Sequence, residues 1–211
     1  MNVIRSLIRA SCYAFVLSCC ALVANGATIT LDSNSSTVFY GTYPTGAATY
    51  NIGTGGGVWA GPIGTSSWVS FNPNTYPGGG VTPPNGTYNY YDAFTAAAGD
   101  IGSITVLADD TTSVYLNGFL IAPSAPIISD PAVPCTIGTP NCATYATYVL
   151  PQSDFLNGTN VLSFGVQQAF GAATGLDFEA TIGPTPEPSS ILMLGTGLLS
   201  AAGMVRRRIK A

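Results

Sequence analysis

The chain has 211 residues, of which 8% are charged, and its charges are separated along the sequence. The six basic residues occupy positions 5, 9, 206–208 and 210, the ten acidic residues lie between Asp32 and Glu187, and there is no histidine. A central region without a single cation argues against nucleic acid as a partner, since that binding depends on neutralised phosphates, and it disfavours phosphate-bearing cofactors.

The first 26 residues have the pattern of a secretion signal. Arg5 and Arg9 provide a positive start, Ala10–Ala24 is apolar, and small residues precede the expected cut after Gly26, with Ala27 as the alternative. This predicts an N-terminal signal helix that a signal peptidase removes. A short buried helix and a lipoprotein signal ending at Cys19 are the alternatives.

Residues 27–183 predict one all-β domain. The region is rich in Gly, Pro, Thr, Ser, Asn and Tyr, and short alternating segments recur between turn signals. About eight to ten short strands predict a two-sheet β-sandwich, with the jelly roll as the first choice. Strands are expected near residues 28–31, 37–40, 48–52, 68–71, 88–94, 104–108, 114–116, 119–121, 144–150, 162–166 and 176–182.

Two stretches, 53–57 and 72–85, carry so much Gly, Pro and Asn that they are expected to be surface loops. Aromatic residues near these loops suggest a platform on which sugar rings stack. Packing inside a sandwich is the alternative for the same residues. The residues concerned are Trp59, Trp68, Tyr76, Tyr88, Tyr90 and Tyr91.

Two turn signals follow each other in the middle of the chain. Asp109 and Asp110 begin the first, and their carboxylates are candidate ligands for Ca²⁺, although Asp is also a common turn residue. Asn117-Gly118 is the second and predicts a tight hairpin between two apolar segments. Apart from this possible Ca²⁺, no cofactor is expected.

The segment Ala108–Gly118 resembles the strand-turn-strand stretch of galactose-binding-like and other carbohydrate-binding jelly rolls. In that family the hairpin is largely structural, with Val114 and Leu116 facing inward. The later segment Gly175–Ala180 is similar to the closing strand of exported proteins of this type. The resemblance implies a fold more than a ligand.

Three of the five cysteines lie in the signal region, which leaves Cys135 and Cys142 in the exported part. Outside the cytoplasm such a pair is expected to form a disulfide that closes a loop between strands. A two-cysteine metal site is the alternative, but there is no histidine to complete it.

The last predicted strand alternates apolar and polar residues. Leu176, Phe178, Ala180 and Ile182 are expected to face the core, and Asp177, Glu179 and Thr181 to face water. Asp177 and Glu179 therefore share a face about 7 Å apart, a spacing that suits the two carboxylates of a glycosidase. The mature region has no His or Lys to act as a base, so carboxylates are the candidates for acid-base chemistry.

The C-terminal residues 184–211 consist of three parts in a fixed order. Pro186, Glu187 and Pro188 come first, followed by the uncharged segment Ile191–Val205 and then by Arg206, Arg207 and Arg208. The apolar run predicts a short transmembrane helix, and the arginines would act as a membrane stop on the cytoplasmic side.

This tail resembles the PEP-CTERM sorting signal. The resemblance implies recognition by an exosortase, a membrane cysteine protease that removes the tail near the motif. It also implies export in a Gram-negative bacterium that makes extracellular polysaccharide, with a transient inner-membrane anchor and then a place on the cell surface or in the extracellular matrix. A plain anchor that is never cleaved is the alternative.

Two functions are compatible with the sequence. The first is a non-catalytic surface or matrix protein whose sandwich contacts exopolysaccharide. The second is a polysaccharide hydrolase that acts through carboxylates. The absence of His, Lys and Arg from the central region favours the first, so we do not expect an enzyme.

Overall fold

A computed structural model describes residues 27–126, 135, 138–185, 195 and 197–199. The predicted signal peptide lies outside these residues, as does most of the predicted transmembrane segment. Among the described residues, no helix has the length and apolar character needed to cross a membrane.

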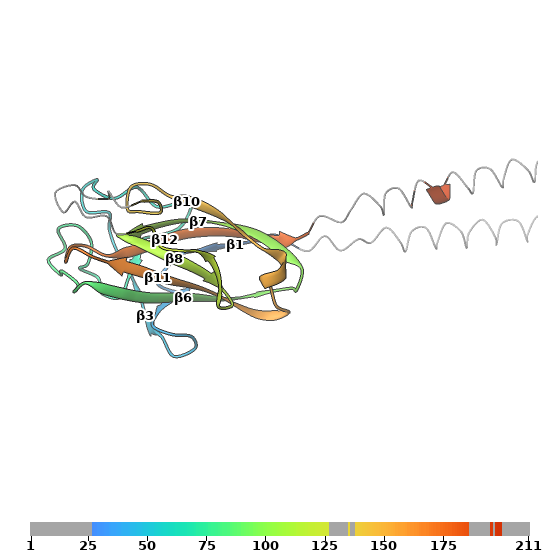
Figure 1. Ribbon diagram of the computed structural model, residues 1–211, viewed down its shortest axis with the longest axis horizontal. Helices are drawn as coiled ribbons and strands as arrows, with labels where there is room; N and C mark the ends of the chain where they lie inside the picture. Colours follow the sequence, from blue (N-terminus) through green and yellow to red (C-terminus); the bar gives the residue numbers. More distant parts are fainter. Residues whose placement is uncertain (1–26, 127–134, 136–137, 186–194, 196, 200–211) are drawn as a thin grey trace, which may run out of the picture.

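Two six-stranded sheets form a sandwich, seen as two layers in Figure 1. We name each sheet after its long central strand. The β12 sheet contains β1 (Ile29–Asp32), β4 (Tyr50–Asn51), β5 (Val69–Ser70), β7 (Asp100–Asp109), β10 (Ala146–Leu150) and β12 (Gly175–Pro184). The β11 sheet contains β2 (Val38–Tyr40), β3 (Ala47–Ala48), β6 (Gly86–Ala96), β8 (Thr111–Leu116), β9 (Phe119–Ala122) and β11 (Gly158–Gln168). A 3-10 turn, Gln152–Asp154, lies between β10 and β11.

The strand order explains how the chain closes the sandwich. Every pairing is antiparallel, and from β6 to β12 the chain alternates between the two sheets except at the β8–β9 hairpin. The resulting orders are β1-β12-β7-β10 in one sheet and β6-β11-β8-β9 in the other. This alternation is the pattern expected of a jelly roll, and it brings β6, β11 and β8 side by side.

The predicted strands occur where the alternating segments lie, with changes at their ends. The segment 48–52 forms two strands of two residues each, separated by Thr49, rather than one strand. Residues 53–57 and 72–85 contain no strand, as expected. The Asn117-Gly118 hairpin is confirmed: both residues have positive φ, 51° and 84°, as a tight turn that follows the twist of its strands requires.

The main core lies between the sheets. Leu162, Phe164 and Val166 of β11 are buried there, and Phe164 stacks on Phe178 of β12 with ring centroids 4.6 Å apart. Alternation on β12 is confirmed for the residues expected to face inward, since Leu176, Phe178, Ala180 and Ile182 are all buried. Burying these aliphatic and aromatic side chains is the main driving force for closing the sandwich.

One expectation about β12 is wrong. Asp177 does not face water but is completely buried, whereas Thr181 is exposed and Glu179 is half-buried. The reason is a second apolar cluster on the outer face of the β12 sheet, where Trp59, Trp68 and Cys142 cover Leu107, the register partner of Asp177. Segments without strands therefore form a third layer over this sheet.

Candidate functional site: an uncharged tyrosine groove

A groove lies on the outer face of the β11 sheet. Register places Tyr91 of β6, Ser163 of β11 and Tyr115 of β8 in one row across the sheet. Because Leu162, Phe164 and Val166 point into the core, Ser163 and Gly165 point outward and form a low floor. β6 and β8 are two strand spacings apart, about 9 to 10 Å, so the larger side chains on these strands form walls on both sides of that floor.

The resulting cavity has a volume of about 340 Å³. This is at the small end of the range for pockets that bind small molecules. Its lining includes Tyr43, Asn89, Tyr91, Tyr115, Ser163 and Gly165. Gly165 has no room for a larger residue in the present arrangement, because a Cβ there would lie 2.7 Å from Ser113 Oγ.

Tyr91 is held in place from three sides. Its hydroxyl accepts a hydrogen bond from the Gly46 amide at 3.1 Å, Phe39 stacks against its ring at 5.5 Å, and Tyr43 meets it edge-on at 5.5 Å and 88°. Tyr91 is 5% exposed while Tyr43 is 44% exposed. The buried ring therefore fixes the orientation of the exposed one.

The side chains that line this groove are uncharged, and four of them carry polar atoms without a partner among the described residues. Within the described part of the chain, no residue forms a hydrogen bond with the side chains of Tyr43, Asn89, Tyr115 or Ser163. Hydroxyl and amide groups both donate and accept hydrogen bonds, as sugar hydroxyls do. The groove thus combines apolar ring surface with neutral hydrogen-bonding groups.

Of the two interpretations of these aromatic residues, packing inside the sandwich is confirmed for most of them. Tyr90 and Trp68 are completely buried, and Trp59 is 3% exposed. Tyr88 stacks on Phe71, and Tyr76 packs against the second apolar cluster. Of the expected set, Tyr91 and the otherwise buried Tyr90 belong to the groove lining.

Sequence reasoning missed Tyr43 and Tyr115. The inward-facing Val114 and Leu116 imply that Tyr115 points outward, so a partial signal was present. The sequence carries no sign that β8 lies two strands from β6 or that residues 41–46 fold over Tyr91. Both facts depend on the pairing of strands that are distant in sequence.

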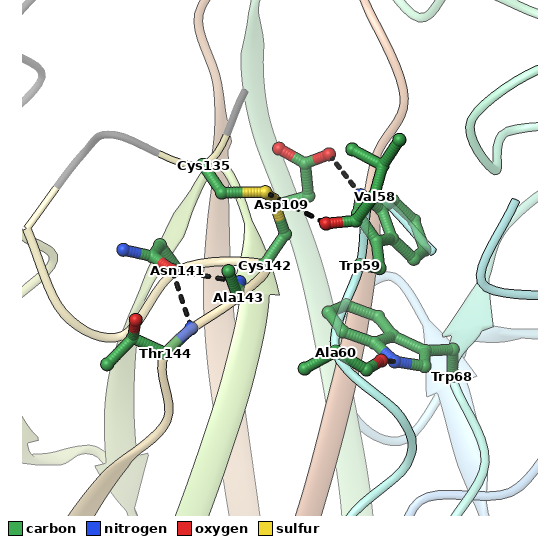
Figure 2. Close-up of a disulfide and its surroundings, with 10 residues drawn as sticks. All are labelled: Val58, Trp59, Ala60, Trp68, Asp109, Cys135, Asn141, Cys142, Ala143 and Thr144. Carbon is green, nitrogen blue, oxygen red and sulfur yellow. Dashed lines mark hydrogen bonds between the residues drawn. A yellow bond between two sulfur atoms is a disulfide. The ribbon is translucent and has the colours of Figure 1, made fainter. Parts of the chain in front are cut away.

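A second polar region lies on the other sheet, around the disulfide (Figure 2). Cys135 and Cys142 are bonded to each other, as expected, and Val58 O lies 3.7 Å from Cys135 Sγ. Trp59 Nε1 donates to Asp109 Oδ2 at 2.8 Å, and the Trp59 ring lies 4.3 Å from that of Trp68. This region closes the outer layer over the β12 sheet.

Asp109 and Asp110, the expected Ca²⁺ ligands, lie at the turn from β7 to β8. Asp109 is 7% exposed, and burial together with the neighbouring Asp110 raises the pKa of its carboxyl to about 8. Asp110 Oδ2 accepts a hydrogen bond from the Ala169 amide at 2.7 Å. No group of three or more His, Cys, Asp or Glu able to hold a metal occurs among the described residues. Calcium binding here stays a prediction.

Asp177 and Glu179 do not form an open pair. Asp177 accepts hydrogen bonds from Ser33 Oγ at 2.8 Å, from Ser66 Oγ and from the Ile63 amide at 2.9 Å. Burial raises the pKa of the Asp177 carboxyl. Both of its oxygens therefore hold the covering loop in place.

Comparisons with known proteins address the tail and the fold. Residues 184–208 match the PEP-CTERM protein-sorting motif, which includes the expected residues Pro186, Glu187 and Pro188 and Arg206, Arg207 and Arg208. These six named residues lie outside the part of the chain that the structure describes. A search among curated proteins finds no match to the chain.

Solved structures give distant likenesses. A family 35 carbohydrate binding module from Clostridium thermocellum is 14% identical, covering 74% of this chain and 99% of its own, with a TM-score of 0.37. A related module from Paenibacillus barcinonensis is 13% identical, with coverages of 74% and 99% and a TM-score of 0.39. A GH2 beta-galacturonidase from Eisenbergiella tayi is 16% identical over 79% of this chain and 26% of its own, with a TM-score of 0.40.

At these identities and scores the likenesses assign neither a ligand nor an activity to this chain. The sorting motif does carry information, because it indicates an exported protein that an exosortase handles. The chain is therefore an exported protein with a β-sandwich body and a PEP-CTERM protein-sorting motif at residues 184–208.

Proposed function

We propose that this is a non-catalytic protein of the cell surface or extracellular matrix that binds polysaccharide through the tyrosine groove. In this proposal the tail anchors the chain in the inner membrane, with Arg206–Arg208 on the cytoplasmic side, until exosortase cuts near Pro186–Pro188. The sandwich is then released to the surface of a Gram-negative cell.

The groove is the observation that carries the proposal. A tyrosine offers an apolar ring face to the C–H groups of a sugar and a hydroxyl to its oxygens. Tyr43 and Tyr115 are accessible, Tyr91 is fixed behind Tyr43, and Asn89 and Ser163 add free polar atoms between them. Rigid aromatic residues lose little conformational entropy on binding, which favours the recognition of a repeating chain.

The burial of Asp177 argues against the alternative, a carboxylate-dependent hydrolase. A glycosidase needs one carboxylic acid and one carboxylate that both reach the scissile bond. Asp177 is fully buried and engaged by Ser33, Ser66 and Ile63, so a glycan has no access to it. The predicted Asp177–Glu179 pair is therefore not an open site. The register partner of Glu179 is Asp32 on β1, whose Oδ2 accepts a hydrogen bond from Thr65 Oγ1 at 2.6 Å.

Calcium is a separate question from the groove. The groove lining contains no carboxylate, so binding there is expected to be independent of calcium. If Asp109 and Asp110 bind Ca²⁺, the ion would act at the β7–β8 turn, where it would affect stability. Comparing glycan binding in calcium and in chelator separates these two roles.

The test is a glycan array with the full-length chain, with and without calcium, for wild type, Tyr43→Ala and Tyr115→Ala. The matched controls are Tyr50→Ala and Tyr145→Ala, which remove tyrosines that are 49% and 63% exposed outside the groove. We expect each groove variant to bind about tenfold more weakly and the controls to bind like wild type. Binding that is insensitive to both groove variants, or no binding at all, contradicts the proposal.

A hydrolysis assay on the glycans that bind completes the test. We expect no turnover by wild type, Asp177→Asn or Glu179→Gln. Turnover by wild type that is lost in correctly folded Glu179→Gln establishes the hydrolase and overturns the non-catalytic assignment.

A further inference from the structure

We infer that the groove is selective for neutral glycans and rejects polysaccharides that carry carboxylate, sulfate or phosphate groups. This inference rests on the proposed function and specifies its ligand. Two independent observations carry it, the charge of the folded body and the chemistry of the groove lining.

The folded body carries acidic residues and no basic ones. All six basic residues of the chain lie at positions 5, 9, 206–208 and 210, outside the described residues. Eight acidic residues belong to the described part of the chain: Asp32, Asp92, Asp100, Asp109, Asp110, Asp154, Asp177 and Glu179. A polyanionic chain that approaches this body meets repulsion and no fixed cation, and the repulsion is strongest at low salt.

The groove itself offers no compensation for a buried charge. Its hydrogen-bonding side chains include the Ser163 hydroxyl, the Asn89 amide and the hydroxyls of Tyr43 and Tyr115, and no residue of the lining is charged. A carboxylate that leaves water for such a site loses strong hydration and gains no ion pair. A sugar hydroxyl exchanges a hydrogen bond to water for a comparable one to protein, so its transfer costs little.

The acidic residue nearest in sequence to the lining does not change this conclusion. Asp92 follows Tyr91 on β6, but it points inward and is 4% exposed, beside Leu162 and Val38 in the register. Asp177 and Glu179 belong to the other sheet. None of these carboxylates lines the groove, so the negative charge belongs to the body as a whole and the groove keeps neutral hydrogen-bonding groups.

The experiment uses a chemically matched pair of ligands. The neutral polysaccharide that binds best in the array is oxidised at its C6 hydroxymethyl groups, which gives a polyuronate with the same backbone and linkage. Binding of the full-length chain to both forms is measured by calorimetry at low and at high salt. We expect the oxidised form to bind at least about tenfold more weakly at low salt, and the affinity for the neutral form to change less than about twofold with salt.

A lysine introduced into the groove tests whether the lack of positive charge there causes the selectivity. Asn89→Lys puts one positive charge on the exposed wall of the groove, and Val149→Lys makes the same change in net charge at a side chain that is 72% exposed on the other sheet. We expect Asn89→Lys to restore binding of the oxidised glycan at low salt and Val149→Lys to leave it weak.

The possible failures are distinguishable. If wild type binds the oxidised form as tightly as the neutral form, and Tyr115→Ala weakens both, the selectivity inference is wrong while the groove remains the binding site. If both lysine variants restore binding equally, net charge and not the groove controls selectivity, which also overturns the inference. If no glycan of either kind binds, the proposed function itself is wrong.

Discussion

The Tyr43 ring stands perpendicular to the Tyr91 ring, with centroids 5.5 Å apart and an interplanar angle of 88°. Tyr91 in turn stacks on Phe39 and is hydrogen-bonded to Gly46. The loop between β2 and β3 is thereby folded back over its own sheet. Its accessible tyrosine is positioned by a buried tyrosine, so the two residues have different roles.

This division of roles predicts different effects of two substitutions. Tyr43→Ala removes a 44% exposed ring, so we expect a change of no more than about 0.5 kcal/mol in the free energy of unfolding. Tyr91→Ala empties a buried site, and we expect a loss of about 3 kcal/mol. Urea denaturation of both variants measures the difference, and equal losses would contradict the arrangement described here.

The buried Asp177 is predicted to stabilise the fold. Asp177→Ala leaves the Ile63 amide without its acceptor and removes one of two acceptors from each of the Ser33 and Ser66 hydroxyls, and we expect a loss of about 2 kcal/mol or more. Thr181→Ala, at an exposed position on the same face of the strand, is the control and is expected to cost less than about 0.5 kcal/mol. Denaturant midpoints report both values. A neutral result for Asp177→Ala would mean that the covering loop is not held by this carboxylate.

Stability is predicted to fall as pH rises. Burial raises the pKa of Asp92 from 3.8 to about 6, so the folded state binds the proton more tightly than the unfolded chain. Asp92 contributes about 3 kcal/mol to the free energy of unfolding. This contribution is fully present below about pH 4 and is lost as pH rises through about 6. Asp109, whose pKa is raised to about 8, extends the decline in the same direction.

Asp92→Asn isolates the contribution of Asp92. Between about pH 4 and pH 6, the denaturation midpoint of this variant is expected to change less with pH than that of wild type. The decline of the midpoint above pH 6 persists. Asp100→Asn, at the start of β7 and away from the core, is the control and should follow the wild-type curve. Parallel curves for Asp92→Asn and wild type would rule out Asp92 as the source.

The disulfide is predicted to contribute about 2 to 3 kcal/mol, the amount expected for closing a loop of this length. Reduction, or Cys135→Ser with Cys142→Ser, should lower the free energy of unfolding by that amount. Cys142 packs in the cluster with Trp59 and Trp68, so the tryptophan emission should also change. Lower stability with unchanged emission would place the effect of the disulfide outside this cluster.

Gly175 is predicted to be required for the observed position of the Trp59 indole. A Cβ at this position would lie 2.8 Å from Trp59 Cη2, so Gly175→Ala must displace the indole that donates to Asp109. We expect a loss of about 1 to 3 kcal/mol. Gly53→Ala is the control, because a Cβ there has no neighbour within 4 Å and the backbone φ is not in the left-handed region. Equal stability of the two variants would show that Trp59 adapts freely.

The sequence by itself determined the fold class, most strand positions, the Asn117-Gly118 hairpin and the sorting motif. These features depend on local patterns. A period of two specifies which side chains share a face of a strand, an Asn-Gly pair accepts the positive φ of a tight turn, and a sorting signal is read as a linear segment.

The tertiary structure alone decided which face of each strand meets water or another layer. Asp177 satisfies the alternation pattern of an exposed residue, yet residues more than a hundred positions earlier cover it. Tyr91, Ser163 and Tyr115 form one row because β6, β11 and β8 are neighbours. Strand order and loop cover arise from contacts between distant residues, and the local periodicity of a sequence contains no information about them.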